Sequence, residues 1–511
     1  MHNRAEKIEN YRKQLAEEMG IASKVVRQFK RPEERKFLAK EREDVTLIFG
    51  GGLTETHEIL MKGALEGQGY NAEYMPTPDN EALAIGKEYC NRGQCNPTYY
   101  TVGNLIKYLR NLKESGVENI VEKYVFVTAG ACGPCRFGTY EAEYRKALTE
   151  SGFDGFRVLT VNQSVHTEGE NEEAGLRLDK DFYVSIVKAI MVGDLLNEIC
   201  NKLRPYEVNE GETDRALKKS LEGLYLAIKH KKALFFPLRK ARKILGTVSV
   251  DFSKVKPKVQ IIGEFWAQTT EGDGNYRLQR WLQEEGCEVL TSPVCGWVDY
   301  MIWLTKDSVK DALRANKKFK DKKFHLVTYI KLQIAYAMLI HFHTLYRSAL
   351  GFVNARLPSQ KKLARLSHDY YNTKITGGEG HLEVAKNISC IKEKKAHLVI
   401  SVKPFGCMPS LQSDGVQSKV MTDLKEGLFI PIETSGDGEV NVKSRVQMKL
   451  HEARVAAREE FNRYLAEAGI TIDAWKKLAQ VNRGSALSLL KLPHSLSTTA
   501  GNFAYYLKNK S

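Results

Sequence analysis

Cysteines in loops are the residues of this sequence whose type and spacing could carry chemistry. Nine cysteines occur in 511 residues, and the N-terminal segment lacks the apolar core of a secretion signal. We therefore expect a cytoplasmic chain with reduced thiols rather than a disulfide framework. Cys200, Cys287 and Cys390 fall in apolar periodic segments, where a cysteine packs as a small hydrophobic residue. Five others, with Cys295 as a further candidate, fall in or beside expected loops: Cys90, Cys95, Cys132, Cys135 and Cys407.

Three kinds of site fit these loop cysteines. An iron–sulfur cluster commonly combines a close pair of thiolates with distant ligands, here Cys132 and Cys135 with Cys95 and Cys407. Structural zinc would use two close pairs, Cys90 with Cys95 and Cys132 with Cys135, and would leave Cys407 without a role. A thiol–disulfide oxidoreductase would use Cys-Gly-Pro-Cys at 132–135 alone. The spacing favours the cluster over the dithiol and the dithiol over zinc, with inert thiols as the remaining alternative.

The elements that would position these cysteines form two α/β blocks. Short β-branched or aromatic runs alternate with amphipathic helical stretches, a pattern typical of βαβ units with a mostly parallel sheet. We therefore predict an α/β fold with two Rossmann-like lobes of similar wiring. The expected strands are 45–50, 72–75, 124–128 and 156–161 in the first lobe, and 259–263, 288–291, 398–402 and 428–432 in the second.

The remaining segments suggest helical additions around the two lobes. The predicted organisation is a charged helical leader (1–43), a first α/β lobe with the cysteine loops (44–207), a basic helical connector (208–256), a second α/β lobe (257–436) with a helical insertion at about 298–372, and a helical tail (437–511).

The strand order places the cysteines where ligands bind in such folds. Open parallel sheets bind ligands outside the carboxyl ends of their strands. Cys132 and Cys135 follow the strand 124–128, and Cys407 follows the strand 398–402. Cys95 lies before an expected helix at 101–114, in the crossover that leads into the strand 124–128. Two facing lobes would therefore bring these cysteines to one cleft.

Other motifs carry weaker signals. Gly50–Gly52 follows a strand but matches neither a dinucleotide fingerprint nor a P-loop, so we expect a tight turn. The helix dipole alone would explain Glu379 at an expected helix start. His57, His166 and His381 lie near polar loops, where a lone histidine is more often a hydrogen-bonded residue than a ligand.

The formal charge of +15 favours acidic or phosphorylated partners. Basic residues cluster at 229–243 and 316–323, most simply as solvated faces, although the phosphates of coenzyme A are a ligand that such a patch could hold. No nucleic-acid-binding motif accompanies them, so a nucleic-acid partner is not expected. The most apolar region, 329–352, is interrupted by charged residues and histidines, which indicates a buried helix rather than a membrane span.

Five segments together resemble a known family. The likeness runs from about residue 40 to about residue 460, to the dehydratase-like portion of the large activator-related proteins of the 2-hydroxyacyl-CoA dehydratase and benzoyl-CoA reductase superfamily. The segments are NRGQCNPTYYTVGNLIKYL (91–109), TAGACGPCRFGTYEAEYRKAL (128–148), GDLLNEICNKLRPYE (193–207), GEGHLEVAKNI (378–388) and KPFGCMPS (403–410).

The resemblance implies a 4Fe–4S cluster, or a double cubane, held between Rossmann-like lobes. It supports Cys95, Cys135 and Cys407 as ligands, with Cys132 as a fourth and Cys90 as a weaker candidate. It also implies a separate ATP-hydrolysing activator protein with its own cluster, because the sequence has the dehydratase-like part and no nucleotide-phosphate motif of its own.

The function that follows from this resemblance is acceptance of low-potential electrons for radical dehydration or reduction of an acyl-CoA-type substrate. The chain would then be a lyase or an oxidoreductase rather than an ATPase, as a homodimer or heterodimer, with catalytic residues that the sequence does not identify. Two alternatives stay open: a non-catalytic electron-relay or scaffold subunit of an activator complex, and a thiol–disulfide oxidoreductase that uses Cys132 and Cys135.

Overall fold

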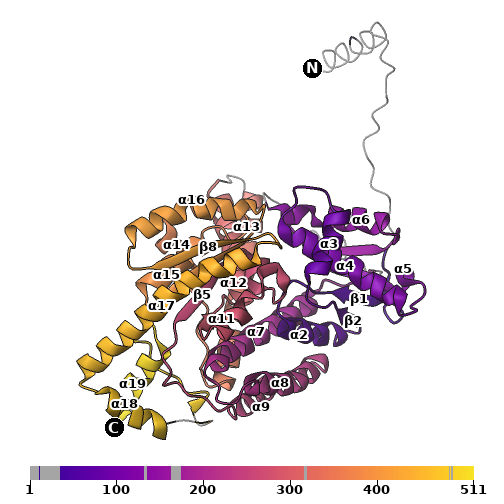
Figure 1. The fold of residues 1–511 in the computed structure, drawn as a ribbon. Coiled ribbons are helices and arrows are strands. Elements are labelled where there is room, and N and C mark those ends of the chain that lie inside the picture. Colours follow the sequence, from indigo (N-terminus) through magenta and orange to yellow (C-terminus); the bar gives the residue numbers. More distant parts are fainter. Residues whose placement is uncertain are drawn as a thin grey trace. The chain divides into compact units, whose positions relative to one another are not determined.

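The computed structural model describes residue 11 and residues 35–131, 135–162, 174–315, 319–482, 484 and 487–510 (Figure 1). Residues 1–35 and residues 36–511 form two separate units. All the elements below belong to the second unit. Cys132, His166 and residues 316–318 of a basic cluster lie outside the described residues.

The first lobe contains a four-stranded parallel sheet in the order β2-β1-β3-β4. Its strands carry buried Val, Ile, Leu and Phe side chains, which the helices of the lobe cover. Its elements are β1 (Thr46–Phe49), α2 (Glu55–Glu66), β2 (Asn71–Tyr74), α3 (Asn80–Tyr89), α4 (Asn96–Glu114), α5 (Ile120–Lys123), β3 (Tyr124–Gly130), the 3₁₀ helix η2 (Arg136–Thr139), α6 (Tyr140–Glu150) and β4 (Arg157–Asn162), preceded by the 3₁₀ helix η1 (Ala39–Glu41).

The second lobe repeats this wiring with a parallel sheet in the order β6-β5-β7-β8. The prediction of two α/β lobes is confirmed, and each of the eight strands begins and ends within two residues of its predicted bounds. Its elements are β5 (Lys258–Gly263), α10 (Phe265–Thr269), the 3₁₀ helix η4 (Asp273–Asn275), α11 (Leu278–Glu284), β6 (Glu288–Leu290), α12 (Val294–Ala315), α13 (Phe319–Ala349), α14 (Gln360–Ser367), α15 (Leu382–Lys392), β7 (Leu398–Pro404), α16 (Met408–Asp423) and β8 (Leu428–Thr434).

In each lobe the direction in which successive strands are added to the sheet reverses between the two central strands. The first strand pairs with the second on one side and with the third on the other. The switch points therefore lie between β1 and β3 and between β5 and β7, where open α/β sheets bind ligands. The two switch points contact each other directly. The indole of Trp266 in α10 donates to Gly51 O at 3.0 Å, and the Thr269 hydroxyl donates to Gly52 O at 2.9 Å.

Two glycines set the position of α4, whose start carries Cys95. A Cβ on Gly86 would lie 1.9 Å from Tyr99 O, and one on Gly103 would lie 1.8 Å from Ala82 O. The backbones of α3 and α4 therefore pack closer than side chains would allow. α4 begins at Asn96 rather than near residue 101, because Pro97 fits the first helical turn, where its missing N–H is not needed.

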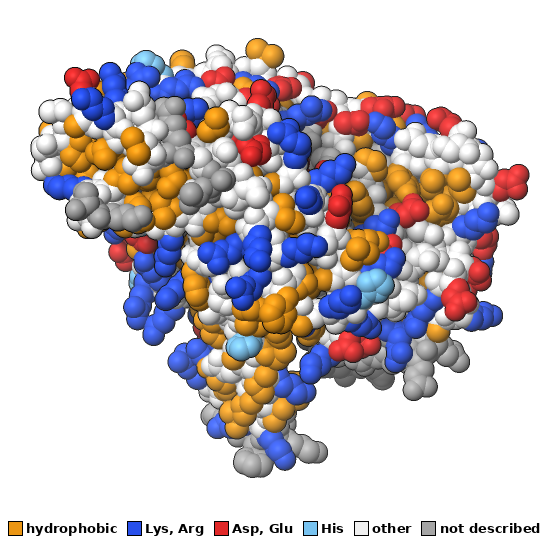
Figure 2. Space-filling view, turned by 90° about the horizontal axis from the view of Figure 1, so that it is seen from below, with side chains coloured by type: hydrophobic (Ala, Val, Ile, Leu, Met, Phe, Trp, Pro, Cys, Tyr) orange, Lys and Arg blue, Asp and Glu red, His pale blue; other side chains and the backbone are white. Residues whose placement is uncertain are grey.

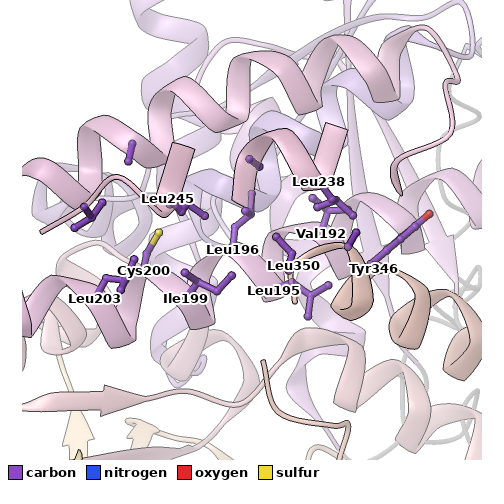
Figure 3. Close-up of a cluster of buried hydrophobic side chains, with 14 of the residues drawn as sticks. Val192, Leu195, Leu196, Ile199, Cys200, Leu203, Leu238, Leu245, Tyr346 and Leu350 are labelled. Atoms are coloured by element: carbon purple, nitrogen blue, oxygen red, sulfur yellow. The ribbon is translucent and has the colours of Figure 1, made fainter. Parts of the chain in front are cut away.

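A helical layer joins the two lobes. Its largest core packs α7 (Lys180–Leu203) against α2 and the connector helices, and Figure 3 shows Val192, Leu196 and Cys200 of α7 beside Leu238 and Leu245 of α9. The other helices of this layer and of the tail are the 3₁₀ helix η3 (Arg204–Tyr206), α8 (Glu212–Lys229), α9 (Phe235–Leu245), α17 (Glu439–Ala468), α18 (Ile472–Val481) and α19 (Thr499–Lys510).

The surface carries more basic than acidic side chains, as the net charge requires, and Figure 2 shows Lys and Arg (blue) outnumbering Asp and Glu (red) on the face seen from below. Within the described ranges, none of the helices has both the length and the apolar character that crossing a membrane requires.

Candidate functional site

Each of the three described cysteines favoured as ligands lies directly before a helix. Cys95 precedes α4, Cys135 precedes η2 and Cys407 precedes α16, each with extended backbone at the N-cap. β3 ends five residues before Cys135, and β7 ends three residues before Cys407. The carboxyl ends of strands thus deliver two of the thiols, and backbone N–H groups of helix starts surround all three. Helix starts favour negative charge, and thiolates are anions.

The loops that carry these cysteines contact one another. The backbone N–H of Asn96, next to Cys95, donates to Phe405 O at 3.0 Å. Gly406 has a φ of +77°, and a Cβ there would lie 3.5 Å from Cys95 Cα and 3.3 Å from the Arg136 guanidinium. Arg136, next to Cys135, donates to Gly93 O in the Cys95 loop. The structure therefore brings together three loops that lie far apart in the sequence.

The thiols themselves are shielded from water. Cys95 and Cys407 are buried, and Cys135 is half-buried. The Cys95 sulfur lies 3.0 Å from the Tyr140 hydroxyl and 3.4 Å from the Thr98 hydroxyl. Burial raises the pKa of Cys135 to about 11 and raises the pKa values of Cys95 and Cys407 as well. A thiol with a raised pKa stays protonated at neutral pH unless a nearby cation favours the thiolate, as bound iron or zinc does.

Two carboxyl groups, of the half-buried Glu264 and the buried Glu379, act on these thiols through their charge. Glu264 directly follows β5 and caps α10 by accepting from Ala267 N at 2.8 Å. Its charge raises the pKa of each of the thiols of Cys95, Cys135 and Cys407. Burial raises the pKa of Glu264 to about 7. The site thus contains a carboxyl group that exchanges its proton near neutral pH.

Glu379 is the second of these carboxyl groups. It is 5% exposed, and burial together with repulsion from Glu264 raises its pKa well above the usual value. The helix dipole does not account for it, because His381 rather than Glu379 is the N-cap of α15. Its loop packs on the Cys407 helix, since a Cβ on Gly378 would lie 2.7 Å from Pro409.

The sequence did not indicate Glu264 or Glu379 as site residues. Both follow a glycine, in Gly263-Glu264 after β5 and in Gly378-Glu379 before α15. An acidic residue directly after the first strand of a lobe was the signal that could have identified Glu264, because that position lies at the switch point.

The other predicted residues lie elsewhere. Cys90 is the C-cap of α3, and the charged groups that act most on its thiol are Glu143, Lys146 and Glu150. Cys295 lies in the first turn of α12, within the large core around α7. Cys200, Cys287 and Cys390 are buried, as expected of packed cysteines.

The remaining polar motifs have structural roles. Gly50–Gly52 forms a tight turn, whose Gly51 N–H donates to the Glu58 carboxyl at 2.7 Å. His57 is buried between the Thr54 hydroxyl at 2.7 Å and the Asp194 carboxyl at 3.2 Å. His381 is fully buried, and its ring packs edge-on against Tyr300 and Trp303. Neither of its ring nitrogens has a hydrogen-bond partner among the described residues, so it is not the hydrogen-bonded histidine that the sequence predicted.

Within the described part of the chain, no three or more His, Cys, Asp and Glu side chains are grouped as they would be around a metal ion. Cys132, the fourth predicted ligand, lies outside those residues. The described thiols nonetheless match the donor chemistry of an iron–sulfur cluster, since all three are cysteines, lie at helix starts and come from touching loops. A comparison with models of known protein families finds no match, and a comparison with curated proteins finds no similar chain.

Proposed function

We propose that this chain is an iron–sulfur protein in which Cys95, Cys135 and Cys407 hold a cluster, with Cys132 as a fourth ligand. One observation carries the proposal: three cysteine loops from two lobes are linked by Asn96 N–Phe405 O and by Arg136. Such a cluster, of the 4Fe–4S or double-cubane type, would supply single electrons at low potential. Thiol–disulfide chemistry has weaker support, because it has no use for a third loop with Cys407, and structural zinc sites commonly use two closely spaced pairs of ligands instead.

Side chains around the three cysteines would stabilise the thiolates and hold protons. The Tyr140 hydroxyl, 3.0 Å from the Cys95 sulfur, is placed to donate to a thiolate and to stabilise its charge. Glu264 and Glu379 would hold protons beside the electron source, since their raised pKa values keep them neutral more readily than ordinary carboxyl groups. The side chains of Cys95 and Cys407 are themselves buried, which shields their sulfur atoms from water.

The electrons would come from a partner protein. Phe405, Met408 and Leu411 lie within four residues of the buried Cys407 in the sequence and are 59%, 47% and 66% exposed. Large apolar side chains that stay exposed mark contact sites for other proteins. We assign this surface to a separate ATP-hydrolysing activator, because an electron donor must dock close to the cluster. The electrons would serve dehydration or reduction of an acyl-CoA-type substrate, as a lyase or oxidoreductase of the cytoplasm.

The test is anaerobic spectroscopy followed by a turnover assay. Protein purified without oxygen should be brown, and reduction should give the electron paramagnetic resonance signal of a reduced cluster. An activator of this superfamily, ATP and a panel of 2-hydroxyacyl-CoA and aromatic acyl-CoA thioesters should then give product. A cluster without turnover of any thioester would leave an electron relay, and colourless protein with zinc would reject the proposal.

A further inference from the structure

A second site lies away from the three cysteines, in a cavity of about 460 Å³ between the helical layer and the second lobe. Cavities of this size hold small molecules of the nucleotide class. Its walls come from α2, α7, the starts of β5 and β6, α15 and the segments 352–358 and 488–494. None of Cys95, Cys135 and Cys407 lines it.

The acidic side chains that line this cavity are engaged in structural contacts. Each accepts hydrogen bonds from groups that fix a helix start or a loop, and the charges of Glu198 and Glu288 also act on Lys202. Asp194 accepts from Val294 N and Cys295 N, both at 2.8 Å; Glu198 accepts from Ala355 N at 2.7 Å and Asn354 Nδ2 at 3.1 Å; Glu288 accepts from Tyr206 Oη at 3.0 Å and pairs with Lys258 at 3.2 Å.

The basic side chains are not balanced in the same way. Lys202, Arg356, Lys386 and Lys491 line the cavity, and none of them forms an ion pair within 4 Å with a described residue. Lys202 donates to a backbone carbonyl, Leu490 O, at 3.0 Å, and its ammonium group lies 5.5 Å from the centre of the Phe252 ring. The lining of the cavity therefore carries an excess of positive charge, with six basic side chains against three acidic ones.

Two of these basic residues, Lys202 and Lys386, are partly buried. Lys202 is in the last turn of α7 and Lys386 is in the middle of α15, and both side chains are only partly exposed. Burial lowers the pKa of each ammonium group. The charges of Glu379 and Glu383 raise the pKa of Lys386, but neither carboxyl group forms an ion pair with it within 4 Å. A buried ammonium without a close partner is costly, and a bound anion would remove that cost.

We propose that this cavity binds a small molecule through a diphosphate group, with Lys202 and Lys386 as the inner contacts and Arg356 and Lys491 at the rim. Several cations around one space suit a ligand with several charges, and a guanidinium binds phosphate through two parallel hydrogen bonds. His343 adds no charge at neutral pH, because burial lowers its pKa to about 4. The diphosphate could be inorganic or part of a nucleotide-type molecule.

This inference goes beyond the proposed function, and its test does not require a cluster. Metal-free full-length protein would be titrated calorimetrically with pyrophosphate and with ADP, without magnesium and at fixed ionic strength. The variants are Lys386→Met, Lys202→Met and Lys386→Arg, and the control is Lys419→Met. Lys419 is exposed on α16, pairs with Asp423 at 2.6 Å and does not line the cavity.

We expect saturable binding of at least one probe to the wild-type protein and a loss of about tenfold to a hundredfold for each methionine variant, the effect of removing one charge-assisted hydrogen bond. Lys386→Arg and Lys419→Met should bind as the wild type does. Equal affinity for both probes would indicate inorganic diphosphate, and tighter binding of ADP would indicate a nucleotide-type ligand.

Two results would overturn the inference: no binding of either probe to the wild type, or unchanged affinity in both Lys202→Met and Lys386→Met. Misfolding is a separable outcome, because Lys386→Met removes an unpaired charge and should melt at or above the wild-type temperature. A variant that binds weakly and melts normally supports the site.

Discussion

Replacing Gly406 by alanine tests the contact between the Cys407 and Cys95 loops. Gly406 has a φ of +77°, a left-handed conformation that costs an alanine about 1–2 kcal/mol. Its new Cβ would also lie 3.3 Å from the Arg136 guanidinium, 3.4 Å from Gln94 O and 3.5 Å from Cys95 Cα. Only the Arg136 guanidinium lies closer than ordinary van der Waals contact, so its flexible side chain must shift by a few tenths of an ångström. This shift would weaken its hydrogen bond to Gly93 O in the Cys95 loop and add at most about 1 kcal/mol.

Gly69 offers a matched control. Its φ is +85°, so alanine is strained there to a similar degree, but no atom lies within 4 Å of the new Cβ. Gly69→Ala should therefore lower stability by about 1–2 kcal/mol without touching the site. The two variants together separate the effect of backbone strain from the effect of displacing Arg136, which joins the Cys135 and Cys95 loops.

The assay combines thermal melting with iron and acid-labile sulfide analysis after anaerobic reconstitution. We expect the two variants to melt within a few degrees of each other, since they carry similar strain, and only Gly406→Ala to lose iron. The reasoning is refuted if Gly406→Ala keeps the wild-type iron content, or if Gly69→Ala loses as much.

Three further predictions concern the surroundings of the site. Burial raises the pKa of Glu58 to about 8, so between pH 4.5 and 8 the folded protein holds a proton that the unfolded chain has released, and stability falls as the pH rises. Glu58→Gln should flatten that fall by up to about 1.4 kcal/mol per pH unit in thermal melts, and an unchanged slope would contradict the assignment. Tyr140→Phe removes the hydroxyl 3.0 Å from the Cys95 sulfur and should make the cluster's reduction potential more negative in a redox titration, whereas Tyr144→Phe should not. Asp194→Ala leaves the first N–H groups of α12 and the His57 ring without their acceptor. The free energy of unfolding in denaturant should therefore fall by about 2–4 kcal/mol, and an unchanged value would contradict this role of Asp194.

The fold was largely predictable because its strands have a strong local signal. Runs such as Val259–Gly263 and Leu398–Val402 are buried on both faces, so nearly every residue is apolar and the strand stands out from the helices around it. The start of α4 was missed, since proline usually breaks helices and Pro97 occupies one of the few helical positions that tolerate it.

The sequence predicted the cysteines of the site, because cysteine is a rare residue type, but not the glutamates and lysines around it. Cysteines after strands are uncommon enough to be noticed, and the loops of Cys95, Cys135 and Cys407 do meet. Glutamate and lysine are common surface residues, and nothing in the sequence around Glu264 or Lys386 shows that tertiary packing buries much of each side chain. Their surroundings are set by elements more than a hundred residues away, which local patterns cannot reveal.

The most direct test of the account is metal and sulfide analysis of anaerobically purified cysteine variants. Cys95→Ser, Cys135→Ser and Cys407→Ser each remove one of the thiols that the three loops bring together, and Cys287→Ser removes a packed core thiol as the control. The account predicts iron with acid-labile sulfide in the wild type and in Cys287→Ser, and a clear loss of both in each of the other three. Zinc in place of iron, or iron and sulfide retained in all three variants, would contradict it.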